Sequence, residues 1–435
     1  MAVEQTMVRK TKIMREDNVT ESTRVTKKRR RETTLADIPN ELLIIIISSL
    51  SVADAARTSI LAKRWQCLWR HTTHLDLEET SMIKSSTCSS YGAVIGMVLN
   101  SHIGDLTSVR FKHFPSGIPG ELEFWVDFVL NKYKKITSLS FECERFDPIS
   151  SDDRLSFRRS RLYKIIRPNF RPMLFSTLSS LELTNYPMWE KSTPEAFDGC
   201  GAKLKTLKIK NMRMSDDVIN SVLSKCLCLE SLSIVKSKEF ISTLVINNPC
   251  LKFLELGCLD VDKVDVDVEG LEILVLDSLE CPPTGFKIHA LHLRILKVSC
   301  NSSSLTKRTS LLKTQDIFEQ CGDLYGYSTL RLETLEITIP VEEDSVGADN
   351  SDNNYWERRD TDGCTNHKLR FVTIKGFRGK EQEVKFIEHL IRRAPLLKKI
   401  TIICESTTIE KEARALLSLP RDSVYLSIIL KCKNL

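Results

Sequence analysis

Three stretches in the middle of the chain share one pattern: residues 229–234 (LESLSI), 251–256 (LKFLEL) and 271–276 (LEILVL). Each begins with leucine, has a second apolar residue three positions later and a third two positions after that. Side chains of a β-strand alternate between its two faces, so the last two apolar residues point to the same side. The pattern therefore predicts short strands with one buried face.

The same unit recurs on both sides of these stretches. Clear copies start at Leu178, Leu204 and Leu293, and successive clear copies start 20 to 26 residues apart. That spacing is typical of leucine-rich repeats, whose period is about 20–29 residues. Weaker copies start at Leu106, Ile136, Leu332, Leu369 and Leu397. We therefore expect an α/β solenoid with a parallel sheet on its concave face, although the asparagine of the repeat consensus is mostly missing.

Two wider intervals interrupt the repeats. The copies at Leu293, Leu332 and Leu369 lie 39 and then 37 residues apart. Within the second interval, residues 341–354 are rich in Glu, Asp, Asn and Ser. This composition predicts an acidic surface loop inserted between repeats, either solvated or recruiting a basic partner.

A short helical module precedes the repeats. Asp37 followed by Pro39 is a plausible helix start, and the residues after it are apolar on nearly every side of a helix. Residues 51–54 have the form of a capping box that opens a second helix, and residues 62–70 fit a third. Three helices in so short a segment cannot bury this much apolar surface, so we expect a partner protein to cover it.

Residues 37–43 (DIPNELL) and 55–69 (AARTSILAKRWQCLW) resemble the F-box of plant proteins. The resemblance implies docking to a Skp-type adaptor and, through it, to a cullin scaffold. It also implies that the following residues contribute to docking or to the core of the module: Pro39, Leu42, Leu43, Ile46, Leu50, Trp65 and Trp69. The family usually has proline where this chain has Ser51, which predicts a less rigid module that still docks. The alternative is that these residues form only the core of a small domain.

The C-terminal region resembles the FBD module that closes many plant F-box repeat proteins. The matching pieces are residues 374–379 (IKGFRG) and 394–402 (APLLKKITI), with a helix expected over residues 381–393 between them. Such a module would cap the open end of the solenoid. The expected domains are a disordered basic tail over 1–34, an F-box over 35–75, irregular leucine-rich repeats over 76–365 and an FBD over 366–435.

The net charge of +6 belongs mostly to the N-terminal tail. Residues 1–34 contain ten basic and five acidic residues, whereas the remainder has 53 basic and 52 acidic residues. A nucleic-acid-binding domain usually has its basic excess on the folded part, so we expect no nucleic-acid partner. The basic run in the tail suits a nuclear import signal, with a solvated charge run as the alternative. The residues of this run are Lys27, Lys28, Arg29, Arg30 and Arg31.

The sequence contains no recognisable catalytic or metal-binding motif. Phosphate-loop, dinucleotide-binding, zinc-protease and serine-hydrolase motifs are all missing, and the 14 cysteines form no CxxC pair. The longest dense apolar run, residues 42–47, is far shorter than the roughly 18 residues of a membrane span. We expect an intracellular protein of the nucleus or cytoplasm with no catalytic residues, no cofactor, no metal and no membrane contact.

The resemblance to plant F-box repeat proteins implies the substrate-recognition subunit of a Skp–cullin–F-box (SCF) type ubiquitin ligase. The face predicted to bind an unknown target protein consists of the outward strand position between the inward residues of successive repeats. Its residues are Glu182, Lys208, Ser233, Glu255, Lys297, Glu336 and Thr373. One alternative is a ligase-independent repeat scaffold. Another is a receptor gated by a small molecule, for which the sequence shows no basic pocket.

Overall fold

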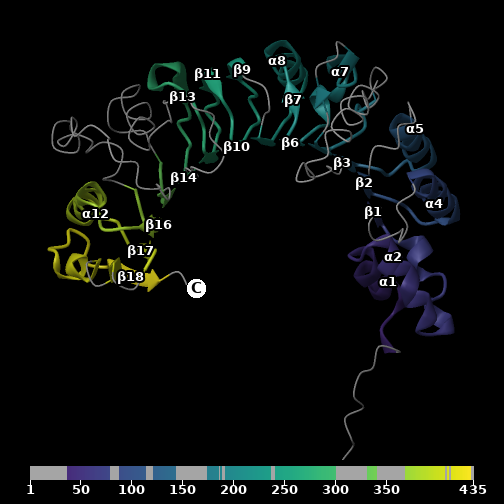
Figure 1. The fold of residues 1–435 in the computed structure, drawn as a ribbon, viewed down its shortest axis with the longest axis horizontal. Coiled ribbons are helices and arrows are strands. Elements are labelled where there is room, and N and C mark those ends of the chain that lie inside the picture. The colour runs from purple at the N-terminus through teal and green to yellow at the C-terminus, as the bar shows by residue number, and fades with distance from the viewer. Residues whose placement is uncertain are drawn as a thin grey trace, which may run out of the picture.

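The fold is described from a computed structural model of the chain. It describes residues 37–78, 88–113, 121–143, 174–185, 187–188, 192–236, 241–299, 331–339, 368–406, 409–410 and 413–432. Along these residues the chain forms an arc that begins at a small helical module and ends near the C-terminus (Figure 1).

The helical module consists of two α-helices and three 3₁₀ turns. Helix α1 spans Asn40–Ser48 and α2 spans Val52–Arg57. The turns are η2 (Thr58–Ile60), η3 (Lys63–Trp65) and η4 (Leu68–His71). A small core of its own holds the module together, formed by Leu43, Ile47, Ala55 and Leu68.

Two details of the predicted module were wrong. Helix α1 begins at Asn40, so the position before the helix is occupied by Pro39 and not by Asp37. The third segment is a series of 3₁₀ turns instead of an α-helix, and extended backbone at Ala62 separates the first turn from the second. Trp65, at the end of η3, and Leu68, at the start of η4, both pack into the core of the module.

A 13-stranded parallel sheet follows and runs along the inner side of the arc (Figure 1). Its strand order follows the chain, as expected for stacked repeats: β1-β2-β3-β4-β6-β8-β10-β12-β14-β15-β16-β17-β18. The strands are β1 (His74–Glu78), β2 (Ser108–His113), β3 (Ser138–Cys143), β4 (Ser180–Thr184), β6 (Thr206–Lys210), β8 (Ser231–Val235), β10 (Phe253–Gly257), β12 (Ile273–Asp277), β14 (Ile295–Ser299), β15 (Thr334–Thr338), β16 (Phe371–Phe377), β17 (Lys399–Cys404) and β18 (Ser427–Cys432). Both the clear and the weaker repeat copies predicted from the sequence are confirmed as strands.

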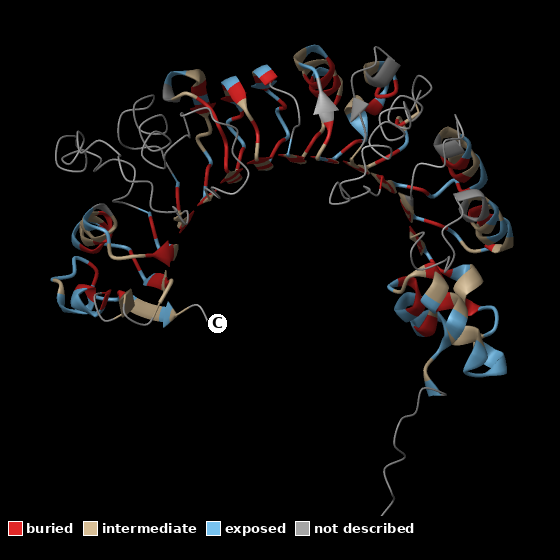
Figure 2. Cartoon of the chain, in the orientation of Figure 1, coloured by how far each residue is buried: buried red, intermediate tan, exposed pale blue. Residues whose placement is uncertain are grey.

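The repeat leucines form a continuous core behind this sheet. In β12, for example, Leu274 and Leu276 are buried while their neighbours on the other face are half-exposed. The register pairs Leu274 with Leu254 on one side and with Leu296 on the other. Buried residues lie along the whole arc (Figure 2). Each strand thus adds one layer to a core that the sequence pattern predicted.

The outer side of the arc carries different elements along its length (Figure 1). Helices α4 (Cys88–Ser101), α5 (Glu121–Lys132), α7 (Ser192–Glu195) and α8 (Asp216–Lys225) cover the earlier repeats. A three-stranded parallel sheet of β9 (Ile241–Ile246), β11 (Val261–Asp267) and β13 (Phe286–His289) covers the middle ones. Smaller elements are the pair β5 (Pro187–Met188) and β7 (Arg213–Met214), with η5 (Cys200–Ala202) and η6 (Pro283–Gly285). The second sheet was not predicted.

A left-handed residue follows each of five consecutive strands of the sheet. These residues have positive φ without being glycine: Asn185, Asn211, Lys236, Cys258 and Ser278. The backbone N–H of each donates to the carbonyl at the end of the next strand, as Lys236 does to Gly257 over 2.7 Å. The side chains of Asn211 and Asn185 are hydrogen-bonded to each other, and Asn185 Nδ2 donates to Cys143 O over 2.6 Å. Asparagine side chains thus link two neighbouring repeats, although each lies one position before the asparagine of the repeat consensus.

The C-terminal module closes the arc. Helix α12 spans Glu381–Arg393, as predicted, and packs Ile387, Leu390 and Ile391 into the core. Strands β17 and β18 extend the same parallel sheet, with η8 (Arg414–Ser418) between them. No helix within the described ranges is long and apolar enough to cross a membrane.

Candidate adaptor-docking surface and target-binding face

Helix α1 divides its apolar side chains between the module's core and solvent. Leu43 and Ile47 are fully buried, whereas Leu42 is 51% exposed and Ile46 48% exposed. Ile45, which the sequence analysis did not select, is 63% exposed. Removing large apolar side chains from water is favourable, so this exposed face is a candidate surface for a partner protein.

A second exposed apolar pair lies on the same module. Ile60 at the end of η2 is 86% exposed and Leu61, which follows it, is 64% exposed. We refer to Leu42, Ile45, Ile46, Ile60 and Leu61 as the F-box apolar set. The continuous apolar run of α1 was the sequence signal for Ile45, whereas nothing in the pattern distinguished Ile60 and Leu61.

The other residues selected from the sequence have different places in the module. Pro39 is exposed, directly before α1. Leu50, Trp65 and Trp69 are half-buried and pack against the core that contains Leu43. The structure therefore places Pro39, like Leu42 and Ile46, at the surface, and gives the two tryptophans a part in holding the module together.

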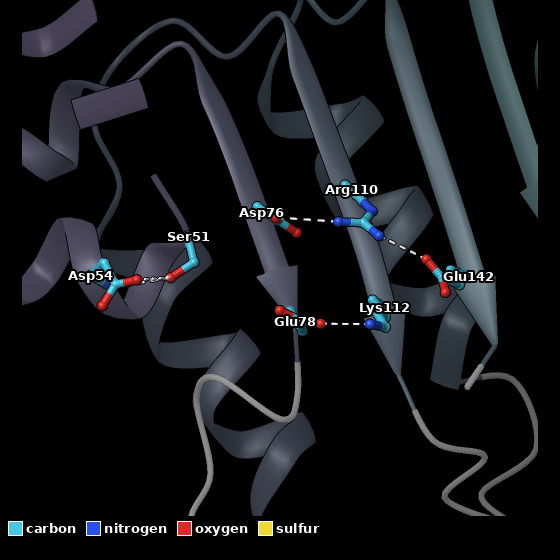
Figure 3. Close-up of polar contacts among 7 residues, drawn as sticks. All are labelled: Ser51, Asp54, Asp76, Glu78, Arg110, Lys112 and Glu142. Carbon is cyan, nitrogen blue, oxygen red and sulfur yellow. Dashed lines mark hydrogen bonds and ion pairs between the residues drawn. The ribbon is translucent and has the colours of Figure 1, made fainter. Parts of the chain in front are cut away.

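Ser51 is the N-cap of α2, at the position where proteins with this F-box pattern usually have proline. Its hydroxyl accepts a hydrogen bond from the Asp54 backbone N–H over 3.2 Å and donates one to Asp54 Oδ2 over 3.0 Å (Figure 3). Arg57 donates to the other oxygen of Asp54 over 2.5 Å. These bonds, that of Arg57 first, lower the pKa of Asp54. The predicted serine cap is confirmed.

Arg64 ties the 3₁₀ segment to the start of α1. Its Nε donates to Asn40 Oδ1 over 2.7 Å, and its Nη2 donates to the Ile38 carbonyl. Charge-assisted hydrogen bonds of this kind are stronger than neutral ones. They link η3, the turn that follows Ile60 and Leu61 in the chain, to the start of the helix that exposes Leu42 and Ile46.

The F-box is joined to the first repeat by a dense set of backbone contacts. The Arg70 carbonyl accepts hydrogen bonds from Ile103 N and Gly104 N, each over 2.9 Å, and Arg70 Nε donates to Ser101 O over 2.6 Å. Gly104 leaves no room for a side chain, since a Cβ there would lie 2.7 Å from His71 Cα. This fit holds the end of the F-box against the loop after α4.

His102 lies at the centre of the same junction. It is 1% exposed, and its Nε2 donates to Thr72 O over 2.8 Å. Its Nδ1 is buried and has no hydrogen-bond partner within the described residues. Burial, chiefly, lowers the pKa of His102 to about 4. The imidazole is therefore neutral at physiological pH.

The seven predicted target-binding positions lie in a single row across the sheet. Register pairs Glu182 with Lys208, Lys208 with Ser233 and Ser233 with Glu255. The row continues through Val275, which the prediction had omitted, to Lys297, Glu336 and Thr373. Because the sheet lines the inner side of the arc, this row lies on the concave face (Figure 1). Whether its residues bind a target stays a prediction.

Ion pairs occupy the N-terminal end of the concave face (Figure 3). Arg110 bridges Asp76 at 3.3 Å and Glu142 at 2.7 Å, so three neighbouring strands are linked. Lys112 pairs with Glu78 at 2.6 Å. The carboxylates nearby raise the pKa of Arg110 despite its partial burial. These charges are already satisfied within the protein.

A second charged cluster lies toward the C-terminal end. Glu336 on β15 accepts from Lys297 on β14 at 3.1 Å and from Lys375 on β16. The bond from Lys375, followed by that from Lys297, lowers the pKa of Glu336. Two of the predicted target-binding residues, Lys297 and Glu336, thus bind each other.

Some predicted features fall outside the described residues. These are the basic run from Lys27 to Arg31 and the acidic segment 341–354, so both stay predictions. Within the described part of the chain, no group of three or more His, Cys, Asp or Glu side chains could hold a metal ion.

Comparison with known proteins assigns three regions of the chain. The F-box domain model matches residues 35–73, the model "FBD-associated F-box protein At5g56370, LRR repeats" matches residues 155–316, and the FBD model matches residues 363–402. These regions agree with the helical module, the middle of the solenoid and the strand–helix–strand unit at its end.

The similar curated proteins come from Arabidopsis thaliana. F-box protein At1g80960 is 27% identical over 427 residues, which cover 85% of this chain and 83% of the relative. FBD-associated F-box protein At1g66310 is 22% identical, with 91% and 95% covered. Putative F-box protein At1g67390 is 30% identical over 55% of this chain, and the match spans about half (48%) of that relative. The chain therefore carries the F-box, the leucine-rich repeats and the FBD that together define F-box/FBD/LRR-repeat proteins.

Proposed function

We propose that the chain is the substrate-recognition subunit of an SCF-type ubiquitin ligase. In this role the F-box binds a Skp-type adaptor, and the concave face of the repeats binds a protein to be ubiquitinated. The chain supplies no catalytic group. It accelerates transfer by holding the target near the conjugating enzyme, because tethering raises the effective concentration of the two reacting partners.

The observation that carries this proposal is the F-box apolar set. Five large apolar side chains are exposed on a module whose own core is already filled by Leu43 and Ile47. Burying such side chains in an interface contributes about 1.5–3 kcal/mol each when the burial is complete. Their exposure is therefore better explained by an adaptor interface than by the internal packing of the module.

Co-purification of the full-length chain with a Skp-type adaptor tests the proposal. We expect the unaltered chain to bind, and the double substitution Leu42→Asp/Ile46→Asp to reduce affinity at least 100-fold, because both changes bury a charge in an apolar interface. Trp65→Ala is less informative, since Trp65 packs against the module's core.

Val424→Asp is the matched control, because Val424 is a 92% exposed apolar residue at the other end of the chain. It should leave adaptor binding unchanged. Failure of the unaltered chain to bind the adaptor, or equal binding by the Leu42/Ile46 variant, would contradict the proposal. Full biological activity of that variant would favour the ligase-independent scaffold instead.

A further inference from the structure

The side chains on the concave face change character between β8 and β10. The first outward position of β4, β6 and β8 is serine or threonine, whereas on β10, β12 and β14 it is Phe253, Ile273 and Ile295. Register places these three side by side, and Val275 occupies the next outward position of β12. We refer to Phe253, Ile273, Val275 and Ile295 as the apolar strip.

The apolar strip is turned away from the core of the solenoid. Its β12 members alternate with Leu274 and Leu276, which are buried behind the sheet. All four side chains remain partly accessible at the concave face. An outward strand face of a solvated repeat is normally polar, so adjacent apolar residues from three strands favour a binding surface over a solvated one.

Two lysines lie on β6, two strands away from β10, the first strand of the apolar strip. Lys208 and Lys210 occupy consecutive outward positions of β6, and both are exposed. Within the described part of the chain, neither has a carboxylate within ion-pair distance, in contrast to Arg110, Lys112 and Lys297 on the same face. These two lysines, which we call the lysine pair, are therefore available to an acidic partner.

Acidic side chains on two strands of the apolar strip, β10 and β12, determine where a partner's negative charge can lie. Glu255 accepts a hydrogen bond from Ser233 over 2.6 Å, and Asp277 accepts one from Ser299 over 2.6 Å. A carboxylate of the partner placed over β10 or β12 would be repelled by them. Its favourable position is over β6, and a uniformly anionic partner is disfavoured.

The strand spacing gives the separation between the two contacts. Neighbouring strands lie about 4.8 Å apart, so β6 is separated from β10 by about 10 Å and from β12 by about 14 Å. An extended chain rises about 3.3 Å per residue. A segment crossing the strands would therefore present acidic side chains about three to five positions away from the apolar ones that contact β10 and β12, and about six away from one that contacts Ile295 on β14.

We propose that the apolar strip and the lysine pair together bind an extended segment of the target protein, in which acidic residues lie three to five positions from a group of apolar ones. This inference rests on the proposed function, because it names the class of target segment that the repeats recognise. Two independent observations support the inference. One is the positive charge of the lysine pair on β6, and the other is the apolar area on β10, β12 and β14.

Selection from a phage-displayed library of random peptides, with the full-length chain bound to its Skp-type adaptor as bait, tests the inference. We expect enriched peptides to combine an acidic group with apolar residues at the stated separation. The variant Lys208→Glu/Lys210→Glu should bind these peptides about tenfold more weakly and should enrich peptides with basic residues at the same place. Ile273→Thr/Ile295→Thr should also weaken binding about tenfold while keeping β-branched residues in the strands.

The matched control is Lys203→Glu/Lys287→Glu, which reverses the charge at two exposed positions outside the 13-stranded sheet. It should leave peptide binding unchanged. Enrichment of no peptide, or of peptides that bind the lysine-pair and apolar-strip variants as well as the unaltered chain, overturns the inference. Adaptor binding, measured in the same preparations, reports separately on the proposed function. If the chain binds the adaptor but enriches no such peptides, this inference fails and the proposed function stands.

Discussion

The Nε2 atom of His102 donates a hydrogen bond of 2.8 Å to the carbonyl oxygen of Thr72, which links the loop after α4 to the end of the F-box. The ring is buried, and its pKa is lowered to about 4, mainly by that burial. Lys132, His71 and Arg70 lower it further by charge repulsion, whereas the bond to Thr72 raises it. Protonation of His102 therefore opposes folding at this junction.

Replacing His102 with glutamine should reduce the pH dependence of the protein's stability. The folded-state pKa lies below the unfolded value of 6.5, so the neutral ring contributes stability that is lost as pH falls from about 6.5 toward 4. Between pH 7 and pH 5 we expect the unfolding free energy to fall by about 1–2 kcal/mol more in the unaltered chain than in His102→Gln. Urea unfolding at both pH values measures this difference, and equal pH dependence of the two proteins would refute the assignment.

Replacement by alanine should change the protein's stability in opposite directions at two glycines that are close in sequence. A Cβ at Gly104 would lie 2.7 Å from His71 Cα, so Gly104→Ala should destabilise the junction by about 1–3 kcal/mol. A Cβ at Gly96, inside α4, meets nothing within 4 Å, so Gly96→Ala should stabilise by about 0.5–1 kcal/mol. Thermal unfolding of both variants decides the matter, and changes of the same sign would contradict the described fit.

Asparagine should be preferred at Lys236. Lys236 has φ 58°, in the left-handed region where Asn185 and Asn211 occupy the equivalent place of earlier repeats. Because asparagine tolerates this conformation better than lysine, Lys236→Asn should raise the unfolding free energy by about 0.5–1 kcal/mol. Lys252→Asn, an exposed site without positive φ, is the control and should change stability by less than about 0.5 kcal/mol. Chemical denaturation measures both unfolding free energies. Equal values for the two variants would show that asparagine at residue 236 does not relieve backbone strain.

Removal of the Glu336 charge should weaken the C-terminal half of the solenoid. Glu336→Gln leaves Lys297 and Lys375 close together without the carboxylate between them, and we expect a loss of about 1–2 kcal/mol at low ionic strength. Salt screens the repulsion, so the loss should shrink at high ionic strength. Glu182→Gln provides the comparison, because Glu182 has no ion-pair partner within the described residues. Urea unfolding at low and high salt should separate the two variants.

The parts of the fold that sequence predicted are those with a local and repeated cause. Each strand of the large sheet follows from its own leucine pattern, and α12 follows from apolar residues at helical spacing bounded by Pro395. The single row of predicted target-binding positions follows from the same alternation. Such features depend on neighbours within one repeat and not on contacts between distant segments.

The missed features depend on contacts between distant segments. The sequence does not show that Gly104 packs against His71, or that Ala62 becomes extended and interrupts a helix-like pattern. The exposure of Ile60 and Leu61 is likewise decided by how η2 packs within its module. The outer sheet of β9, β11 and β13 was not predicted, because each of its strands pairs only with a strand of a neighbouring repeat.

The contacts between Arg70 and the loop that ends at Gly104 have a geometrical consequence for the function proposed above. They hold the F-box at one orientation to the arc, so in the proposed complex each strand would lie at a fixed distance from the ligase core. Six strand intervals separate β1 from β10, a path of about 29 Å along the sheet. A target held at β10 would thus offer the same few of its lysines in every encounter, and choice of the modified lysine would be determined by where along the sheet the target binds.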